Sequence, residues 1–573
     1  MPATTKQIMT PFWLVNWALA LAAGWLLPNH YPPWSSFHID AWVAATLALG
    51  AAAVILRSRG QVAWHGMTLT IAALALIPGL QYGLGLVLLP GTAWISSAYL
   101  LGLLLAVHTG AKWEASSPGQ LADGLFLAIG TSAILSVGLQ LHQWLDLQVL
   151  DAWSMADGLG RPFANFGQPN QLATFLLWGL LAAGWALLRR HIGGRTAILI
   201  ALYLLFGLAL TESRTAWIAI AILITAVWYW RRLWLDPRWP WMVTGLGIYF
   251  FVCASSLGWL GKVLLLGGGA AVTSDVSRMT AELRPAIWLI FLDAASQRPW
   301  LGYGWNQVSL AHLTAALSHP SPGLPFAQSH NLFLDLILWC GIPAGVLVSI
   351  CLARWFWHRI RALNSTEDAV LVLFLLVVGN HAMLELPLHY AYFLLPVGLI
   401  VGALNVRLGA RPILFTGRWL VILLWGTSVL LLAMIIRDYL RIETSFQQLR
   451  FEQARIKFAS PGKPPDVILI TQLSEFIRLA RFEPRSGMSA GDLDWMTRIA
   501  KTYPGAATIR KLALALALNG QAVEAKQWLE TMCRVDSAPQ CDAVRVFWAD
   551  QSWKHPELAA VPWPIPSSAA RSE

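Results

Sequence analysis

Four polar stretches interrupt an otherwise apolar chain, and their side chains are the candidates for chemistry. The first is Ser329-His330-Asn331, in which His330 is a catalytic candidate because an imidazole titrates near neutral pH and can take a proton from a hydroxyl. A histidine at the start of an apolar run can equally serve as a helix cap or an interface residue. Asp335 follows one turn later, and its spacing pairs it with Asn331 rather than with His330.

Two further stretches each carry one arginine, the side chain best suited to bidentate recognition of phosphate. Arg214 ends the segment Glu212-Ser213-Arg214 between two short apolar runs, where a cation needs an anionic partner or a function. The structural alternative is an ion pair with Glu212 or a side chain that reaches out to the membrane interface. Arg284 stands in a longer polar loop, where the alternative is simple solvation.

The fourth stretch, residues 160–171, is dense in side-chain amides and ends where a new apolar run begins. Amides and a guanidinium together can bind a polar, anionic substrate. The alternative interpretation is a turn rich in proline, glycine and asparagine, with a helix cap at Asn170. The candidate substrate-binding residues here are Arg161, Asn165, Gln168 and Asn170.

Carboxylates at two other places have both a functional and a structural interpretation. Glu385 ends an apolar run, where it can orient an acceptor, pair with an arginine or cap a proline-containing hairpin. Asp492-Leu493-Asp494 has the Asp-x-Asp form of a metal site, but it precedes a helical run, and a helix N-terminus favours acidic residues without any metal. We therefore expect no metal and no cofactor.

The elements that position these residues are expected to be transmembrane helices. The 573 residues are 57% hydrophobic and only 12% charged, with a mean hydropathy of +0.56. Apolar runs near 20 residues match the roughly 30 Å hydrocarbon core of a membrane. Such runs predict about 13 spans, near residues 11–27, 41–56, 63–80, 93–109, 121–142, 171–188, 196–211, 215–230, 240–260, 331–352, 368–385, 390–406 and 419–437.

The net charge of +10 is explained by basic loops rather than by nucleic-acid binding, because lysines and arginines cluster between alternate apolar runs. The positive-inside rule then predicts a cytoplasmic N-terminus, and an odd number of spans predicts a C-terminal region outside. Two long outer loops follow, near 143–170 and 261–330. Arg161, Arg214, Arg284 and His330 all fall on the outer side, an arrangement suited to a reaction on a diphosphate-linked substrate in the outer leaflet.

The expected domains are a transmembrane region, 1–437, and a soluble helical region, 438–573. In the soluble region, helical spacing over residues 508–518 and 522–533 flanks Asn519-Gly520 and resembles one tetratricopeptide-type helix pair. Cys533 and Cys541 also lie there, and they can form a disulfide only if the region is in an oxidising compartment.

These motifs together resemble the O-antigen ligase and polymerase superfamily, and most closely the bacterial protein O-oligosaccharyltransferases of the PglL type. Residues 161–173 are similar to a signature ending in Gln-Pro-Asn-x-Leu-Ala. The order Ser213-Arg214, Arg284-x-x-x-Trp288, Pro299-x-x-Gly302-Tyr303-Gly304 and His330-Asn331-x-x-Leu334 is similar to the shared ligase pattern, and Glu385-x-Pro387-x-x-Tyr390 to the PglL-type sequence.

The resemblance implies an inner-membrane enzyme that moves an oligosaccharide from undecaprenyl diphosphate to a Ser or Thr hydroxyl of a periplasmic or surface protein such as a pilin. It also implies that Arg214 and Arg284 bind the diphosphate and that His330 is catalytic. Two related activities stay open at this point, an O-antigen ligase acting on lipid A-core and an O-antigen polymerase. A transporter is the alternative of a different class, although the sequence lacks the repeated broken helices typical of transporters.

Overall fold

The computed structural model describes residues 8–57, 60–155, 161–234, 236–264, 283–456 and 462–563. Residues 265–282 of the predicted outer loop near 261–330 lie outside these ranges. The described chain is almost entirely helical and divides into two compact units. Unit 1 comprises residues 1–75, 98–279 and 350–433, and unit 2 comprises residues 76–97, 280–349 and 434–573.

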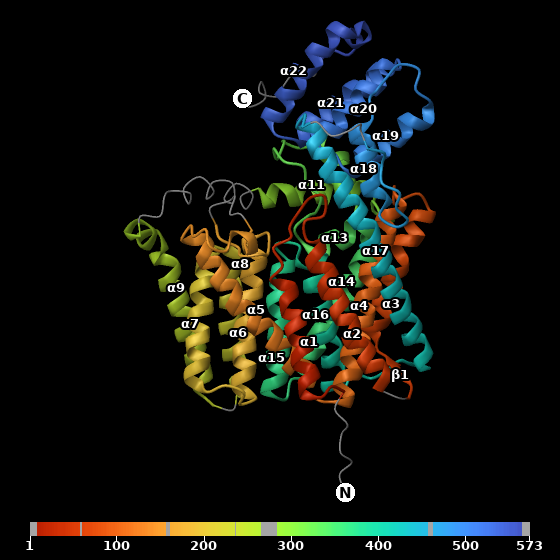
Figure 1. Cartoon of the computed structure of the whole chain (residues 1–573). Helices are drawn as coiled ribbons and strands as arrows, with labels where there is room; N and C mark the ends of the chain where they lie inside the picture. The colour runs from red at the N-terminus through yellow and green to blue at the C-terminus, as the bar shows by residue number, and fades with distance from the viewer. Residues whose placement is uncertain are drawn as a thin grey trace. The chain divides into compact units, whose positions relative to one another are not determined.

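Unit 1 is a bundle of long helices (Figure 1). Its elements are α1 (Pro11–Trp25), α2 (Phe37–Arg57), β1 (Val62–Trp64), α5 (Gln120–Trp144), η1 (Asp151–Trp153), α6 (Pro169–Leu188), α7 (Gly194–Leu210), α8 (Arg214–Tyr229), α9 (Trp239–Val263), α15 (Thr366–Ala382), η3 (Pro387–His389), α16 (Ala391–Arg407) and β2 (Leu414–Thr416). The boundaries between the units fall within α3 (Gly66–Gly83), α4 (Pro90–Ser116), α14 (Ile342–Arg361) and α17 (Arg418–Gln453). The strands β1 and β2 form a short antiparallel pair, with Ala63 opposite Phe415.

Small residues allow the helices of unit 1 to approach closely, as is usual where lipid supplies no hydrophobic drive between helices. A Cβ atom added at Gly110 of α4 would lie 2.0 Å from the carbonyl oxygen of Leu399 in α16. Gly402 of α16 approaches the carbonyl oxygen of Val107 equally closely. In the core of the bundle the ring of Trp178 stacks on Phe374 with centroids 3.9 Å apart.

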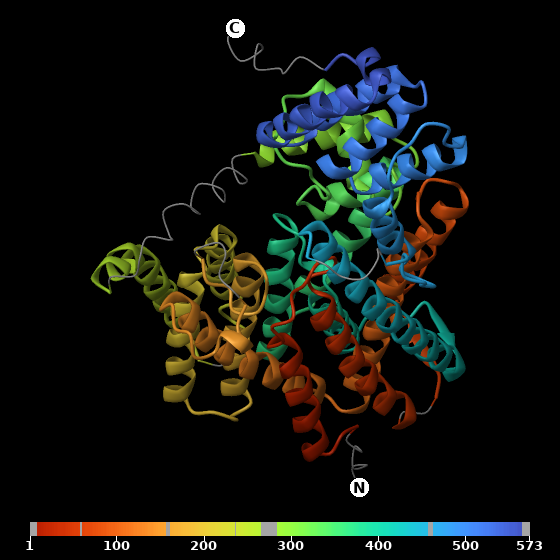
Figure 2. The same ribbon diagram turned by 45° about the horizontal axis from the view of Figure 1, so that its top comes forward.

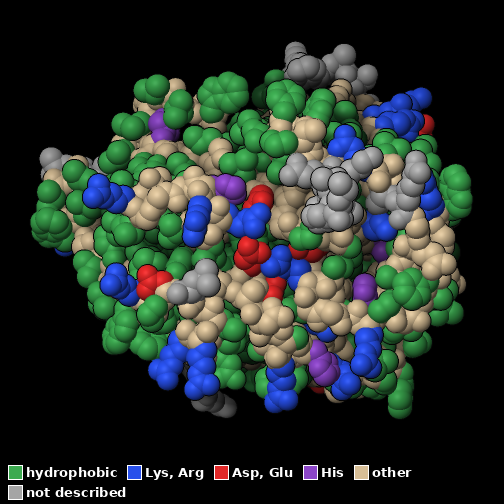
Figure 3. Space-filling model, turned by 90° about the horizontal axis from the view of Figure 1, so that it is seen from below, with side chains coloured by type: hydrophobic (Ala, Val, Ile, Leu, Met, Phe, Trp, Pro, Cys, Tyr) green, Lys and Arg blue, Asp and Glu red, His purple; other side chains and the backbone are tan. Residues whose placement is uncertain are grey.

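A partly buried ion network connects helix ends at one end of unit 1. The guanidinium of Arg407 contacts Glu114 at 2.9 Å and Glu367 at 2.8 Å, and it also bonds Asp368. Arg189 contacts the same Glu367 at 3.2 Å. The face seen in Figure 3 carries many Lys and Arg side chains. This distribution agrees with the basic loops found in the sequence.

Twelve of the predicted spans coincide with helices, while the span predicted at 331–352 is two helices. The break lies at Gly341, between α13 (Leu332–Cys340) and α14, where φ is +82° and a Cβ would lie 2.2 Å from the carbonyl oxygen of Trp300. Only glycine combines that φ with so close a backbone contact. Among the described residues, seven helices are long and apolar enough to cross a membrane, namely α2, α3, α4, α5, α6, α9 and α17.

Unit 2 contains α11 (Arg284–Gln297), α12 (Val308–Ala315), η2 (Ala316–Ser318), α13, α18 (Thr471–Arg481), α19 (Ala490–Thr502), α20 (Ala506–Leu518), α21 (Ala522–Val535), α22 (Ala538–Lys554) and η4 (Pro556–Ala560). Its core joins Leu313 and Ala316, of α12 and η2, to helices α19–α22. Figure 2 shows this green part of the chain beside the blue C-terminal helices. The helices predicted on either side of Asn519-Gly520 are confirmed as α20 and α21. A disulfide joins Cys533 of α21 to Cys541 of α22.

The predicted boundary at residue 437 falls inside α17, which continues without interruption to Gln453. The division into regions 1–437 and 438–573 therefore stays a prediction about the membrane and the soluble parts of the chain.

Candidate active site

The residues predicted to do chemistry fall into one group in each unit. Unit 1 holds the Asn170 cluster, defined here as Arg161, Asn170, Glu212, Ser213, Arg214 and Glu385. Unit 2 holds the His330 cluster, defined as Arg284, Trp288, Ser329, His330, Asn331 and Asp335. We describe each cluster by itself.

The side-chain amide of Asn170 joins the segments of the Asn170 cluster. Its Oδ1 accepts a hydrogen bond of 2.7 Å from the hydroxyl of Ser213, and its Nδ2 donates to Glu385 Oε1 at 3.3 Å. Three stretches that the sequence singled out separately thus meet at one amide. The structure assigns the cap of α6 to Gln168 and not to Asn170, so the capping role considered for Asn170 is wrong.

Two helix N-termini converge at this amide. Asn170 lies in the first turn of α6, and Ser213 is the N-cap of α8, where its hydroxyl accepts from the amide N–H of Ala216. Each N-terminus carries partial positive charge from the helix dipole and orients N–H groups outward, which favours anions. Arg214, the first residue of α8, is exposed and has no ion pair among the described residues, including Glu212. The cluster therefore presents a cation and two dipole ends to an anion.

Arg161 positions the turn that carries Arg214. Its Nε and Nη2 donate to the carbonyl oxygen of Thr211 at 3.1 and 2.6 Å, which satisfies the C-terminus of α7. Burial lowers the pKa of Arg161, nearby Glu212 raises it, Arg214 lowers it and Glu385 raises it. These electrostatic effects confirm that the carboxylates and guanidiniums of the cluster are near neighbours.

Asn165 is buried within unit 1. Its side chain is 1% exposed, its Nδ2 donates to the carbonyl oxygens of Leu26 and Trp153, and its Oδ1 accepts from the N–H of Met155. Its hydrogen bonds therefore connect loops within unit 1, and its role in substrate binding stays a prediction. Gln168 is exposed at the start of α6 and remains available to a ligand.

Two residues that support this loop were not found from the sequence. Gln143 in α5 accepts from the N–H groups of Phe163 and Ala164 at 3.0 and 2.7 Å. The Nε2 of His30 donates to the carbonyl oxygen of Asn165 at 2.6 Å, and burial lowers the pKa of His30 to about 4. The polar residues Gln140, His142 and Gln143 near the end of an apolar run were the available signal for Gln143, whereas nothing near His30 in the sequence indicated its partner.

In the His330 cluster, His330 lies in a strained turn directly before α13. Its φ is +57°, a conformation that costs a residue with a Cβ about 1–2 kcal/mol. Residues held in such conformations often belong to functional sites, because the surroundings must enforce them. Asn331 is the N-cap of α13, and its Oδ1 accepts from the N–H groups of Phe333 and Leu334.

Neighbouring side chains enforce this turn through Ser329, which is fully buried. The indole N–H of Trp288 donates to the carbonyl oxygen of Ser329 at 3.0 Å. Asp335 Oδ1 accepts from the N–H of Ser329 at 2.9 Å. Arg284 starts α11 one turn before Trp288, so both lie on one face of that helix. The motifs around Arg284 and His330 therefore meet in unit 2.

Asp335 is closer to His330 than the spacing argument predicted. Its carboxylate supports the residue before His330, and the two side chains interact electrostatically. The sequence argument considered only contacts within a helix, whereas His330 lies outside α13 on a turn that folds back over its first residues.

The Pro299–Gly304 motif docks against the end of α13. The N–H of Tyr303 donates to the carbonyl oxygen of Leu338 at 2.7 Å, and the N–H of Ile342 donates to that of Pro299 at 2.7 Å. Gly302 has a φ of +67°, and a Cβ there would lie 2.4 Å from the carbonyl oxygen of Leu338. The motif thus fixes the helix that follows His330.

Asp492 and Asp494 have structural roles in unit 2. Ser489 caps α19, accepting from the N–H of Asp492 and donating its hydroxyl to the Asp492 carboxylate at 2.8 Å. Asp494 pairs with Arg498 one turn later at 3.2 Å. The helix-start interpretation of this Asp-x-Asp sequence is confirmed.

Comparison with known proteins gives matches along most of the chain. Residues 162–187 match a family described as protein glycosylation ligase, residues 197–349 one described as O-antigen ligase, and residues 369–535 one described as virulence factor membrane-bound polymerase, C-terminal. A general O-oligosaccharyltransferase of Acinetobacter baylyi is 30% identical over 532 residues, which are 90% of this chain and 91% of that protein. The chain belongs to the bacterial protein O-oligosaccharyltransferases of the PglL type. A ComP-specific O-oligosaccharyltransferase of the same organism is 30% identical over 249 residues, 43% of this chain and 44% of that protein.

This O-oligosaccharyltransferase is a membrane glycosyltransferase, and the matched ranges contain its candidate residues except Arg161, which lies one residue before the first range. The glycosylation-ligase range includes Gln168 and Asn170, and the O-antigen-ligase range includes Arg214, Arg284 and His330. Glu385 falls within the polymerase-type range.

The indole bond to Ser329 gives a testable consequence. Trp288→Phe keeps aromatic packing but removes the indole N–H group that hydrogen-bonds Ser329 and holds the His330 turn. We expect the rate of glycan transfer to fall on the order of 10- to 100-fold, as for small misplacements of a reacting group. Binding of the glycan donor should change little. The control is Trp300→Phe, at a tryptophan of unit 2 that is 76% exposed. Equal transfer rates for both variants in a purified assay would show that the bond does not position His330.

Proposed function

We propose that this O-oligosaccharyltransferase takes its glycan from undecaprenyl diphosphate at the periplasmic side of the inner membrane. The acceptor is a Ser or Thr hydroxyl of a periplasmic or surface protein such as a pilin. The observation that carries the donor assignment is the convergence of Arg161, Arg214 and the N-termini of α6 and α8 at Asn170. Such a combination suits a diphosphate. The relative named for one specific protein supports a protein acceptor.

Arg214 and Arg284 bind the diphosphate in this proposal. Each stands at the first position of a helix, α8 and α11 respectively, so each guanidinium is joined by the positive end of a helix dipole. The departing diphosphate gains negative charge as the sugar leaves, and fixed cations stabilise that charge most in the transition state. Arg161 contributes by holding the turn before Arg214.

His330 is the proposed general base. The acceptor oxygen attacks the anomeric carbon, the bond from that carbon to the phosphate oxygen breaks, and undecaprenyl diphosphate leaves. The hydroxyl proton passes to the imidazole of His330 as the new glycosidic bond forms. Trp288 and Asp335 act as positioning residues, because both hold Ser329. Glu385, held by Asn170, orients the acceptor and is the second candidate for the base.

We further propose about 13 spans, a cytoplasmic N-terminus and a periplasmic C-terminal region. The arginines of the turns after α6 and α8 support the cytoplasmic assignment of these turns. The disulfide between Cys533 and Cys541 supports an oxidising compartment for the C-terminal region.

Transfer to lipid A-core and polymerisation of O-antigen are the neighbouring activities. A deletion strain separates them, because loss of pilin glycosylation with normal lipopolysaccharide ladders supports the protein acceptor. Altered ladders with normal pilin would favour ligase or polymerase activity. Flux of the lipid-linked sugar in proteoliposomes without transfer would favour a transporter.

The catalytic assignment predicts a specific response at His330. His330→Ala should insert normally and bind the lipid-linked donor, but transfer should fall by about 10²- to 10⁴-fold, the usual contribution of a general base. His330→Gln should be similarly slow, because an amide can position a hydroxyl but cannot accept its proton. The measurement is in vitro transfer from a defined lipid-linked oligosaccharide to purified pilin. Near-normal transfer by the Gln variant would reduce His330 to an orienting role, and normal transfer by the Ala variant would move the base to Glu385.

The proposed orientation predicts which exposed positions react from outside the cell. Trp553 of α22 is 91% exposed, and Arg195 is exposed at the start of α7. In a background with Cys351 replaced, a membrane-impermeant maleimide should label Trp553→Cys in spheroplasts and Arg195→Cys only after permeabilisation. The reverse pattern would invert the topology.

A further inference from the structure

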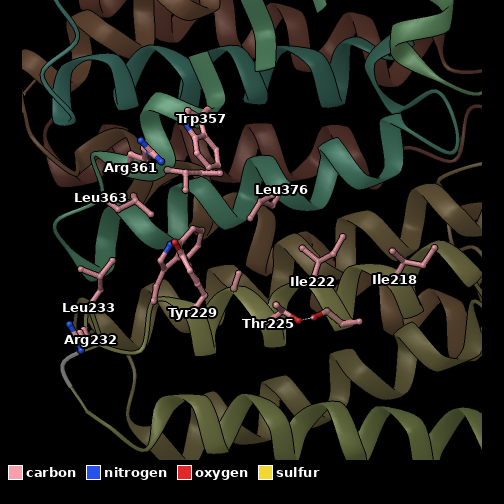
Figure 4. Close-up of a pocket in the computed structure, with 14 residues that line it drawn as sticks. Ile218, Ile222, Thr225, Tyr229, Arg232, Leu233, Trp357, Arg361, Leu363 and Leu376 are labelled. Atoms are coloured by element: carbon pink, nitrogen blue, oxygen red, sulfur yellow. Dashed lines mark hydrogen bonds between the residues drawn. The ribbon is translucent and has the colours of Figure 1, made fainter. Parts of the chain in front are cut away.

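An open groove runs along α8 in unit 1, and none of the residues that line it belongs to the Asn170 cluster. Its volume is about 790 Å³, and α8, the turn after it, the end of α14 and α15 form its walls (Figure 4). The lining residues are Ile218, Ala221, Ile222, Thr225, Ala226, Tyr229, Trp230, Arg232, Leu233, Trp357, Ile360, Arg361, Leu363 and Leu376.

The body of the groove is apolar. Ile218 and Ile222 lie toward one end, with Leu376 across from them on α15 (Figure 4). The hydroxyl of Thr225 donates to the carbonyl oxygen of Ala221 at 2.8 Å, so it is already satisfied within α8. These walls suit a hydrocarbon chain.

The opposite end is cationic. Arg361 on one wall and Arg232 on the other both lie toward that end, as Figure 4 shows, and both are exposed. Arg361 stacks over the ring of Trp357 at 4.5 Å, and within the described ranges neither guanidinium has a carboxylate partner. Tyr229 and Trp357 beside them are 79% and 53% exposed, as aromatic residues at a membrane interface often are. This end therefore offers charge complementarity to an anionic headgroup.

The length of the groove matches one leaflet. From Ile218 to Tyr229 the helix α8 advances eleven residues, or about 16 Å at 1.5 Å each. Half of a hydrocarbon core of about 30 Å is about 15 Å. An acyl chain whose headgroup lies at the arginines therefore has about 16 Å of apolar wall to lie against.

We propose that this groove binds an anionic phospholipid, with the phosphate at Arg232 and Arg361 and an acyl chain along Ile218, Ile222 and Leu376. The orientation proposed above makes this the cytoplasmic leaflet. The site goes beyond the transfer reaction, because its lipid is neither donor nor acceptor and lies at the end of α8 opposite Arg214.

Native mass spectrometry of the delipidated full-length protein, titrated with phosphatidylglycerol or phosphatidylcholine, tests the proposal. We expect the wild type to retain phosphatidylglycerol in preference to phosphatidylcholine. The double variant Arg232→Gln/Arg361→Gln should bind phosphatidylglycerol on the order of 30-fold more weakly, since each basic residue near anionic lipid contributes about 1 kcal/mol. The matched control is Arg190→Gln/Arg195→Gln, which removes one exposed arginine from the turn after α6 and one from the first turn of α7, but none from the groove.

Two outcomes would overturn the assignment. Equal weakening by both double variants would mean that only the general charge of this face attracts the lipid. Equal retention of phosphatidylcholine by the wild type would mean that the headgroup is not recognised. Ile222→Trp fills the apolar body and keeps both arginines, so it should also weaken binding, and normal binding by this variant would exclude the groove. Because lipid binding is measured without glycan transfer, the result is independent of the catalytic proposal.

Discussion

The two hydrogen bonds of the Asn170 amide join the start of α6, the start of α8 and the segment that follows α15. A partly buried polar side chain that lacks a partner costs free energy, so these two bonds favour the three segments in this arrangement. The position of Arg214 depends on this set, because Ser213 both caps α8 and donates to Asn170. Arg161 adds to it by binding the carbonyl of Thr211.

Hydrogen bonds between separate segments also hold the His330 cluster together. His330 needs a left-handed backbone, and that conformation persists because Trp288 and Asp335 hold Ser329 while Asn331 caps α13. Glu212, beside Ser213 and Arg214, also has a positive φ of 47°. In both clusters a proposed functional residue is therefore in or beside a strained turn that hydrogen bonds enforce. Such turns hold a side chain in one orientation at a helix end. Irregular backbone is tolerated there because its polar groups are not exposed to the hydrocarbon of the membrane.

The sequence predicted the helices well because their apolar runs are long and their ends carry strong signals, such as Ser489 before Asp492. It did not predict the break at Gly341, because the cause is a close approach of Trp300 from another part of the chain. The types and order of the candidate site residues also follow from the sequence alone. The hydrogen bonds of Asn165 do not, because its partners Leu26, Trp153 and Met155 come from separate loops. Spacing along one helix likewise hid the approach of Asp335 to His330.

The central claim is that Asn170 acts by holding Arg214 for the donor diphosphate, and a double-mutant cycle on donor affinity tests it most directly. Binding of a lipid-linked oligosaccharide would be measured for Asn170→Ala, Arg214→Gln and the double variant, each reconstituted in the same lipid. If Asn170 works through Arg214, both single changes weaken binding and the double variant binds no more weakly than Arg214→Gln. If the two losses instead add to within about 0.5 kcal/mol, as expected for independent residues, Asn170 does not position Arg214 and the account is wrong.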